Sequence, residues 1–202
     1  MLTRRTLLIA GAAGTASLLA SGFPAAAQSI PTVEEVLFDE AIPTIGNPDG
    51  DVTIAEYFDY QCPFCKRGHP DLLDVVASDG NIRLVMKDWP IFGEPSVYAA
   101  SLVLAAGDDY EAAHTALMKT EGRLSRDDVD ATLAGAGHDP ERLAARAAEQ
   151  ATRIQGILDR NTNQASAFGF RGTPVYLVNT QLNYGAMDKA ALLAAVERAR
   201  AA

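Results

Sequence analysis

The only two cysteines of the chain, Cys62 and Cys65, are separated by two residues. They follow an apolar run, residues 52–60, whose β-branched and aromatic side chains favour a strand. An amphipathic run follows them and predicts a helix that ends near residue 78. Pro63 suits the first helical position, because the N–H that proline lacks has no partner there. The spacing therefore predicts a strand, a tight turn and a helix whose N-cap is Cys62.

The N-terminus of a helix favours an anion, because its first backbone N–H groups have no partner within the helix and the helix dipole is positive there. A thiolate is such an anion. A cysteine in a Cys-x-x-Cys pair can have a pKa of roughly 3.5–7.5, against about 8.5 for a free cysteine. We therefore predict that Cys62 is the reactive nucleophile and that Cys65, one helical turn deeper, is the resolving thiol.

Three other interpretations of the cysteine pair compete with redox chemistry. A structural disulfide across two residues would constrain the unfolded chain little. A zinc site needs about four ligands, and His69 is the one histidine near the pair along the chain, since His114 and His138 lie far away in sequence. Two inert core thiols are the third interpretation. The strand–turn–helix context favours redox chemistry with no metal ion, and a metal-binding module of Cys62, Cys65 and His69 is kept as an alternative.

The first 27 residues have the features of a cleaved export signal. Arg4 and Arg5 give a positive start, residues 7–20 are apolar but too few to span a bilayer, and small residues precede the expected cleavage point. The arrangement around the two arginines resembles a twin-arginine signal, and an ordinary secretory signal is the alternative. Both predict a periplasmic protein whose mature chain, residues 28–202, forms one domain.

Net charge narrows the class of partner. The chain carries a formal charge of −9, and the predicted signal contains two arginines and no acid, so the mature chain is more acidic still. This argues against nucleic acid and anionic membrane surfaces as partners. An exported protein meets an oxidising compartment, where a single cysteine pair is too few to form a framework of disulfides. This context strengthens the redox interpretation.

Periodicity predicts the elements on either side of the cysteine segment. A short apolar patch, residues 36–38, is expected to form an edge strand. Residues 82–88 read as a second strand, and the succession of strand, helix and strand implies that it pairs in parallel with the first. Residues 95–168 show no β signal and are predicted to be helical, with room for about four helices.

The C-terminal part of the chain returns to β-structure. Residues 175–178 are predicted to form a third strand, which pairs with residues 181–184 as a hairpin. Residues 188–201 are predicted to form a last helix. Its inward-facing side chains are expected to be Leu192, Leu193 and Val196.

Three features together resemble the DsbA-like branch of the thioredoxin superfamily. They are the segment at residues 58–65, the helical insertion at residues 95–168, and residues 171–174 just before a strand. The resemblance covers nearly all of the mature chain. It implies an α/β fold, a thioredoxin-like mixed sheet with an all-helical insertion. It also implies a protein-disulfide oxidoreductase that needs no cofactor.

The resemblance assigns further roles around the cysteines. It implies that the Thr173–Pro174 peptide bond is cis and faces the pair, with the backbone of Thr173 ready to bind an extended substrate as an added strand. The alternative is an ordinary trans proline that opens a strand. With Pro63 and Phe64, this loop would form an apolar surface that binds substrates of varied sequence.

The same resemblance implies that Glu56 and Lys87 form a proton relay. Glu56 lies six residues before Cys62, and Lys87 lies 25 residues after it, at offsets where the superfamily can place a buried acid and its partner lysine. A buried acid near Cys65 would have a raised pKa and could relay the proton of that thiol. The alternative is an ion pair or a solvent-facing pair at strand ends.

One residue departs from the strongly oxidising DsbA type, which has histidine before the second cysteine, where this chain has Phe64. The pKa of Cys62 then depends on the helix terminus alone, so its oxidising power should be less extreme. We expect a dithiol oxidase that acts on thiol- or disulfide-containing proteins with a membrane redox partner. The alternative is an isomerase or reductase kept reduced by such a partner. Residues 28–48 are too short for a dimerisation stalk, so a monomer is expected.

Overall fold

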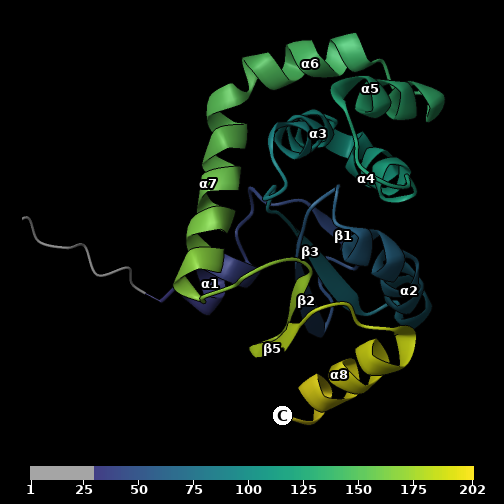
Figure 1. Ribbon diagram of the computed structural model, residues 1–202. Coiled ribbons are helices and arrows are strands. Elements are labelled where there is room, and N and C mark those ends of the chain that lie inside the picture. The colour runs from purple at the N-terminus through teal and green to yellow at the C-terminus, as the bar shows by residue number, and fades with distance from the viewer. Residues whose placement is uncertain (1–29) are drawn as a thin grey trace, which may run out of the picture.

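The computed structural model describes residues 30–202, whose arrangement is shown in Figure 1. The export signal predicted at residues 1–27 lies outside the described residues. A sheet occupies the centre, helices lie on both sides of it, and a further group of helices stacks above it (Figure 1). Within residues 30–202, none of the helices combines the length and the apolar character that crossing a bilayer requires.

The sheet is mixed, as predicted. In spatial order its strands are β1 (Thr44–Gly46), β3 (Ile82–Asp88), β2 (Val52–Phe58), β4 (Val175–Val178) and β5 (Gln181–Tyr184). Strands β2 and β3 run parallel, and the other neighbouring strands run antiparallel. All seven residues of β2 are buried, as a central strand covered on both faces should be. The cysteine segment thus leaves the sheet from its central strand.

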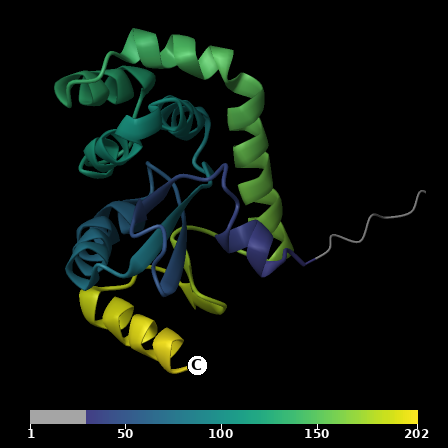
Figure 2. The same cartoon turned by 180° about the vertical axis from the view of Figure 1, so that it is seen from behind.

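The two faces of the sheet contact different helices. Helices α2 (Pro63–Asp79) and α8 (Lys189–Ala201) cover one face, and α1 (Val33–Leu37) and α7 (Ala151–Ala167) lie against the other (Figures 1 and 2). Because side chains alternate along a strand, neighbouring residues of β2 face different helices. Tyr57 faces α7, where its hydroxyl donates to Gln164 at 2.8 Å. Glu56 faces the opposite side, toward α2.

The chain between β3 and β4 is helical, as predicted. It contains α3 (Glu94–Leu104), the 3-10 turn η1 (Gly107–Asp109), α4 (Tyr110–Met118), α5 (Arg126–Gly135), α6 (Pro140–Glu149) and α7. Five α-helices form where about four were expected, because Gln150 ends α6 and begins α7. In Figure 1, α3 to α6 stack above the sheet and α7 runs back down beside it to α1.

The predicted edge strand at residues 36–38 is wrong. Thr32 and Glu35 form a capping box, in which each side chain accepts a hydrogen bond from the backbone N–H of the other residue, and α1 begins there. These local bonds favour a helix over a strand for so short an apolar run. The edge strand is β1 instead, which pairs with β3.

Two smaller predictions also need correction. Strand β2 ends at Phe58 rather than residue 60, because the carbonyl of Asp59 accepts a hydrogen bond from the Cys62 N–H and closes a turn. In α8, Leu192 and Val196 are buried, whereas Leu193 is exposed. Adjacent helical residues point about 100° apart, so Leu193 does not share the face of its neighbour.

Candidate redox site

Cys62 occupies the N-cap of α2. Its backbone is extended (φ −76°, ψ 115°), Pro63 follows at the first helical position, and the Cys65 N–H approaches its Sγ at 3.5 Å. Both cysteines are free thiols. The predicted position of Cys62 is therefore confirmed. Its sulfur lies where the unpaired N–H groups of a helix start stabilise a thiolate.

The segment directly before β4, residues 173–174, lies against this thiol. The Thr173–Pro174 peptide bond is cis, as predicted. The Cys62 Sγ lies 3.2 Å from the Thr173 carbonyl oxygen, to which the thiol donates when it is protonated, across 111 residues of chain. Pro174 is buried, and Thr173 is partly buried. The structure therefore brings Thr173 into direct contact with Cys62.

The two thiols differ in their hydrogen bonds more than in their exposure. Cys62 is 1 % exposed and Cys65 is fully buried. A hydrogen bond from the Cys65 thiol lowers the pKa of Cys62 to about 6, and contacts with Thr173 and the backbone amides of Cys65 and Phe64 outweigh the opposing effect of burial. Burial raises the pKa of Cys65, and its hydrogen bond to Cys62 adds to this effect. At neutral pH the pair therefore holds one thiolate, on Cys62, and one proton, on Cys65.

Glu56 lies beneath the pair, on the face of β2 that α2 covers. It is fully buried, and Tyr176 is its neighbour in register on β4. The Tyr176 hydroxyl lies close to Gly68 of α2. Within residues 30–202, neither carboxyl oxygen of Glu56 finds a hydrogen-bond partner. Burial raises the pKa of Glu56 to about 8, so the acid holds a proton at neutral pH.

Asp59 fixes the turn between β2 and Cys62. Its carboxylate accepts hydrogen bonds from the N–H groups of Gln61, Ile91 and Phe92 and from the Ser96 hydroxyl, at 2.7–3.0 Å. Asp59 is 1 % exposed. One buried carboxylate thus joins the cysteine turn to the segment after β3 and to the start of α3.

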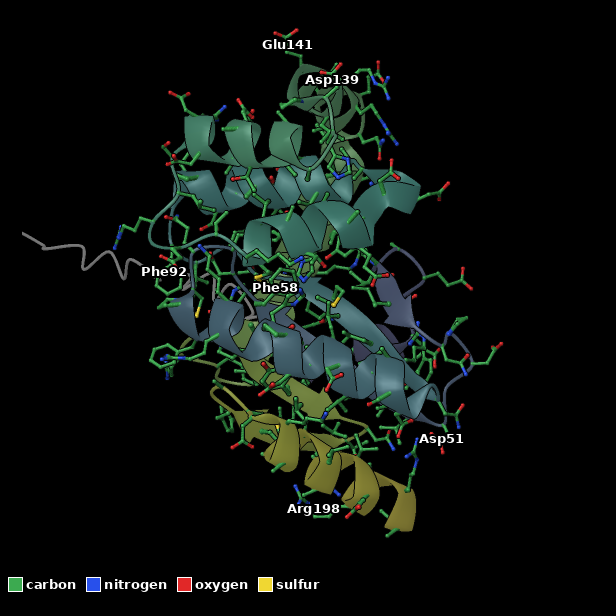
Figure 3. The ribbon with its side chains drawn as sticks, turned by 90° about the vertical axis from the view of Figure 1, so that its right-hand side faces the viewer. Asp51, Phe58, Phe92, Asp139, Glu141 and Arg198 are labelled. Carbon is green, nitrogen blue, oxygen red and sulfur yellow. The ribbon has the colours of Figure 1, made fainter. Side chains whose placement is uncertain are left out.

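Gln61 extends this network to the other side of the turn. Its amide donates to the Phe92 carbonyl at 3.1 Å and to the Ser96 hydroxyl at 3.0 Å, and its oxygen accepts from the Leu124 N–H at 3.2 Å. The turn that carries Cys62 is therefore held to two segments of the helical insertion. Figure 3 shows Phe92 beside the N-terminal end of α2.

The site lies within a segment that matches a known family. A sequence model described as thioredoxin matches residues 39–198. The chain belongs to the thioredoxin family.

Solved structures support the same assignment. This thioredoxin-family chain is similar to a thioredoxin-like oxidoreductase from Silicibacter pomeroyi DSS-3, with 37% identity and a TM-score of 0.81 over 85% of this chain and 99% of that one. It is also similar to the thiol-disulfide exchange protein alpha-DsbA2 from Wolbachia pipientis, with 25% identity and a TM-score of 0.76 over 82% and 90% of the two chains. The predicted DsbA-like resemblance and the predicted fold class are confirmed.

The curated relatives are longer proteins. One is the Na(+)/H(+) antiporter NhaA 1 of Salinispora arenicola, 28% identical over 196 residues, which make up 90% of this chain and 29% of the relative. Another is the NhaA 1 antiporter of Mycolicibacterium gilvum, 27% identical over 77% of this chain and 26% of the relative. The chain thus spans less than a third of the length of these relatives.

The predicted pairing of Glu56 with Lys87 is wrong in this thioredoxin-family chain. Lys87 is level with Tyr57 in the parallel register, whereas Glu56 is level with Met86, so the two charged groups lie on opposite faces of the sheet. The Lys87 ammonium donates to Gln164 Oε1 at 3.3 Å on the α7 side. Burial lowers the pKa of Lys87 to about 8. The offset of 25 residues suggested a partner lysine but did not indicate the face of the sheet on which Lys87 lies.

His69, the third member of the alternative metal module, faces the helical insertion. Its ring is buried and packs edge-on against His114, with the ring centres 4.8 Å apart. Burial lowers the pKa of His69 to about 4. Within residues 30–202, no three His, Cys, Asp or Glu side chains gather as a metal ion requires.

Several site residues were not found by sequence reasoning. Asp59, Gln61 and Ser96 hold the cysteine turn, and Asp88 links the sheet to the insertion by accepting a hydrogen bond from the Tyr110 hydroxyl at 3.1 Å. Burial raises the pKa of Asp88 to about 8. The one available signal was Asp59 two residues before Gln61, the spacing at which an aspartate side chain binds a backbone N–H in a turn. The partners of Ser96 and Asp88 depend on distant segments.

The burial of Glu56 predicts a specific effect of pH on stability. Its pKa is about 8 in the folded protein against an ordinary value of 4.5, so the folded chain binds the proton more tightly. The stability that this proton provides is complete below about pH 4.5 and is lost as pH rises through 8. We expect Glu56→Gln to remove this dependence, so that the variant gains stability relative to the parent between pH 5 and 8.

Urea unfolding of the reduced proteins at several pH values measures this difference. Glu111→Gln, which removes an exposed carboxyl group of α4, is the matched control for the change in net charge. A constant difference between Glu56→Gln and the parent from pH 5 to 8 would show that Glu56 is not buried as a protonated acid.

Proposed function

We propose that this protein is a periplasmic protein thiol–disulfide oxidoreductase that acts as a dithiol oxidase through Cys62 and Cys65. The observation that carries this proposal is the unequal pair at the helix start, where Cys62 has a pKa of about 6 and the buried Cys65 keeps its proton. The similar alpha-DsbA2 is named a thiol-disulfide exchange protein, and a similar Salmonella structure is named a periplasmic thioredoxin-like protein, which supports the class and the compartment.

The unequal pair suits a two-step oxidation of substrate dithiols. The oxidised enzyme carries a Cys62–Cys65 disulfide. A substrate thiolate attacks the Cys62 sulfur and forms a mixed disulfide, while Cys65 leaves and takes up a proton. A second substrate thiolate then attacks the substrate sulfur of the mixed disulfide and releases Cys62 as a thiolate. Two electrons pass from substrate to enzyme, and the low pKa makes Cys62 a good leaving group.

Glu56 is proposed to assist the proton transfer at Cys65. Its pKa is raised to about 8, and in its ionised form its negative charge raises the pKa of Cys65. A group with a pKa near 8 can both give and accept a proton near neutral pH. Lys87 has no part in this step, because it lies on the opposite face of the sheet.

Substrate binding is proposed to use the surface around Cys62. Phe64 is 53 % exposed, and the guanidinium of Arg67 lies 4.8 Å from the centre of its ring. Pro63 is also exposed. With Thr173 and Pro174, these residues frame the Cys62 sulfur, and the Thr173 backbone is proposed to pair with an extended substrate chain.

The wider biological setting is also part of the proposal. We propose that residues 1–27 are a cleaved export signal, that residues 28–202 form the thioredoxin-like domain with its helical insertion at about 95–168, and that this domain works as a monomer. Its substrates are proteins that carry thiols or disulfides, and a membrane redox partner reoxidises it. The acidic charge of the chain supports the exclusion of nucleic acid.

Alkylation of the reduced protein across a pH series tests the proposal. We expect Cys62 to react with a neutral alkylating reagent at a rate that rises with a midpoint near pH 6, with Cys65 unreactive. Mass spectrometry of peptides identifies the modified residue. A midpoint near the value of about 8.5 for free cysteine, or no reaction at any pH, would contradict the proposal.

The reduction potential separates the oxidase from its alternatives. Equilibration with glutathione measures it, and known members of this fold range from about −120 mV for strong oxidants to about −270 mV for reductants. We expect a value inside this range, because Phe64 cannot stabilise the thiolate by charge as a histidine would. A value at the reducing end would instead support an isomerase or reductase kept reduced by a membrane partner.

A further inference from the structure

The surface around Cys62 carries an excess of positive charge on an acidic protein. Three segments lie around the site, residues 62–70, 118–124 and 171–174, and Glu121 is the one acid in them. They contain five cations: Lys66, Arg67, Lys119, Arg123 and Arg171. We call this set the basic rim. The chain as a whole carries a charge of −9.

The basic rim is not neutralised by ion pairs. Elsewhere on the described surface, four cations pair with carboxylates within 4.0 Å, namely Arg126, Arg160, Lys189 and Arg200. Over residues 30–202, no cation of the basic rim forms such a pair. The Lys66 ammonium instead donates to the Gly122 carbonyl at 3.1 Å, which fixes one cation between α2 and the α4–α5 connection.

A groove runs along this part of the surface. It measures about 650 Å³ and lies between α2 and the α4–α5 connection, with Lys66, Arg67 and Lys119 on its walls and apolar side chains, including Leu73 and Met118, beside them. A smaller hollow lined by Phe92 and Arg123 shares Pro63 and Gly122 with the groove. Because Pro63 lines both and follows Cys62 directly, the groove and the hollow meet beside the cysteine turn.

We infer that the basic rim and its groove select substrate polypeptides with acidic residues near the reactive cysteine. This inference rests on the proposed function and names the substrate class of the same site. An extended acidic segment would meet unpaired cations along its length, while the attacking thiolate would approach the same positive field. Charge complementarity of this kind mainly raises the rate of association, and salt weakens it.

Three peptides of equal length, each with one cysteine, test the inference. Acidic, neutral or basic residues flank the cysteine, and the measured quantity is the second-order rate of mixed-disulfide formation with the oxidised enzyme. Each rate is divided by the rate of the same peptide with hydroxyethyl disulfide, a neutral reagent, which corrects for the effect of the flanking charges on the peptide thiol. At low salt we expect the acidic peptide to react about tenfold faster than the basic one. The ratio should approach one at high salt.

Charge reversal at exposed positions locates the effect. Lys119→Glu/Arg123→Glu should reduce or reverse the ratio of the acidic-peptide rate to the basic-peptide rate. Arg142→Glu/Arg198→Glu makes the same change in net charge on α6 and α8, away from the site, and should keep the preference. Figure 3 shows Arg198 on α8 at one end of the molecule. Glu141, which precedes Arg142 in the chain, lies at the opposite end.

The outcomes separate this inference from the proposed function. Equal corrected rates for the three peptides would overturn the inference, and so would an equal change of the acidic-to-basic rate ratio in the two double variants. Neither result would contradict the proposed oxidoreductase function. If no peptide formed a mixed disulfide, including the neutral one, the proposed function would fail and the inference with it.

Discussion

Cys62→Ser should abolish thiol–disulfide exchange, whereas Cys65→Ser should keep the first attack and accumulate mixed disulfides. Cys62 supplies the thiolate, because the helix start and the Cys65 thiol stabilise its negative charge. A serine hydroxyl is not ionised at neutral pH, so exchange should fall by about 10³-fold or more, as it does when other enzymes lose their nucleophile. With a substrate disulfide the exchange runs in the reverse direction: Cys62 attacks first, and Cys65 then attacks the Cys62 sulfur and releases the substrate. Cys65→Ser lacks this second thiol, so the mixed disulfide should persist.

Two assays check these roles. Oxidation of a reduced dithiol peptide and reduction of insulin measure turnover, and mass spectrometry after incubation with a disulfide-containing peptide measures the trapped intermediate. The parent protein is the control for full activity. Cys65→Ser is the control for folding and for the attack of Cys62 on the substrate disulfide. Full activity of Cys62→Ser in either assay would refute the assigned roles.

Asp59→Asn should cause a large loss of stability. The carboxylate of Asp59 accepts three backbone hydrogen bonds and one from the Ser96 hydroxyl in a buried position. An asparagine places an N–H₂ group toward some of these donors, which leaves buried N–H groups without partners. Each such loss costs about 1–3 kcal/mol, so we expect about 3 kcal/mol or more in the free energy of unfolding.

Urea unfolding measures this loss, and Asp130→Asn is the matched control. The carboxylate of Asp130 accepts one hydrogen bond, from the partly buried Tyr98 at 2.8 Å, so its loss should cost less than about 1.5 kcal/mol. Similar losses in the two variants would show that the four bonds to Asp59 do not hold the cysteine turn. The alkylation midpoint of Cys62 should also change in Asp59→Asn, because the turn positions its sulfur.

The elements beside the cysteines follow from local patterns in the chain. The strand before Cys62, the N-cap and Pro63 at the first turn each depend on residues within a few positions of one another, and the structure has all three. The edge strand predicted at residues 36–38 is wrong because the capping box of Thr32 and Glu35 begins a helix there.

The contacts of buried polar groups depend on register and could not be predicted in the same way. The superfamily resemblance suggested that Glu56 is buried with Lys87 as its partner. Both residues are buried, but the parallel register of β2 and β3 places them on opposite faces. A shift of one residue in that register would have placed them on the same face, because side chains alternate along a strand. Spacing along the chain carries no information on this choice.

The sequence by itself determined that a reactive thiol would lie at a helix start next to a central strand, because capping and periodicity act between near neighbours. Only the tertiary structure decided what surrounds that thiol. The carbonyl of Thr173 comes from 111 residues away, and the basic rim combines cations from three separate segments. Such contacts arise when strands pair and helices pack, so they depend on the whole fold rather than on any one stretch of the chain.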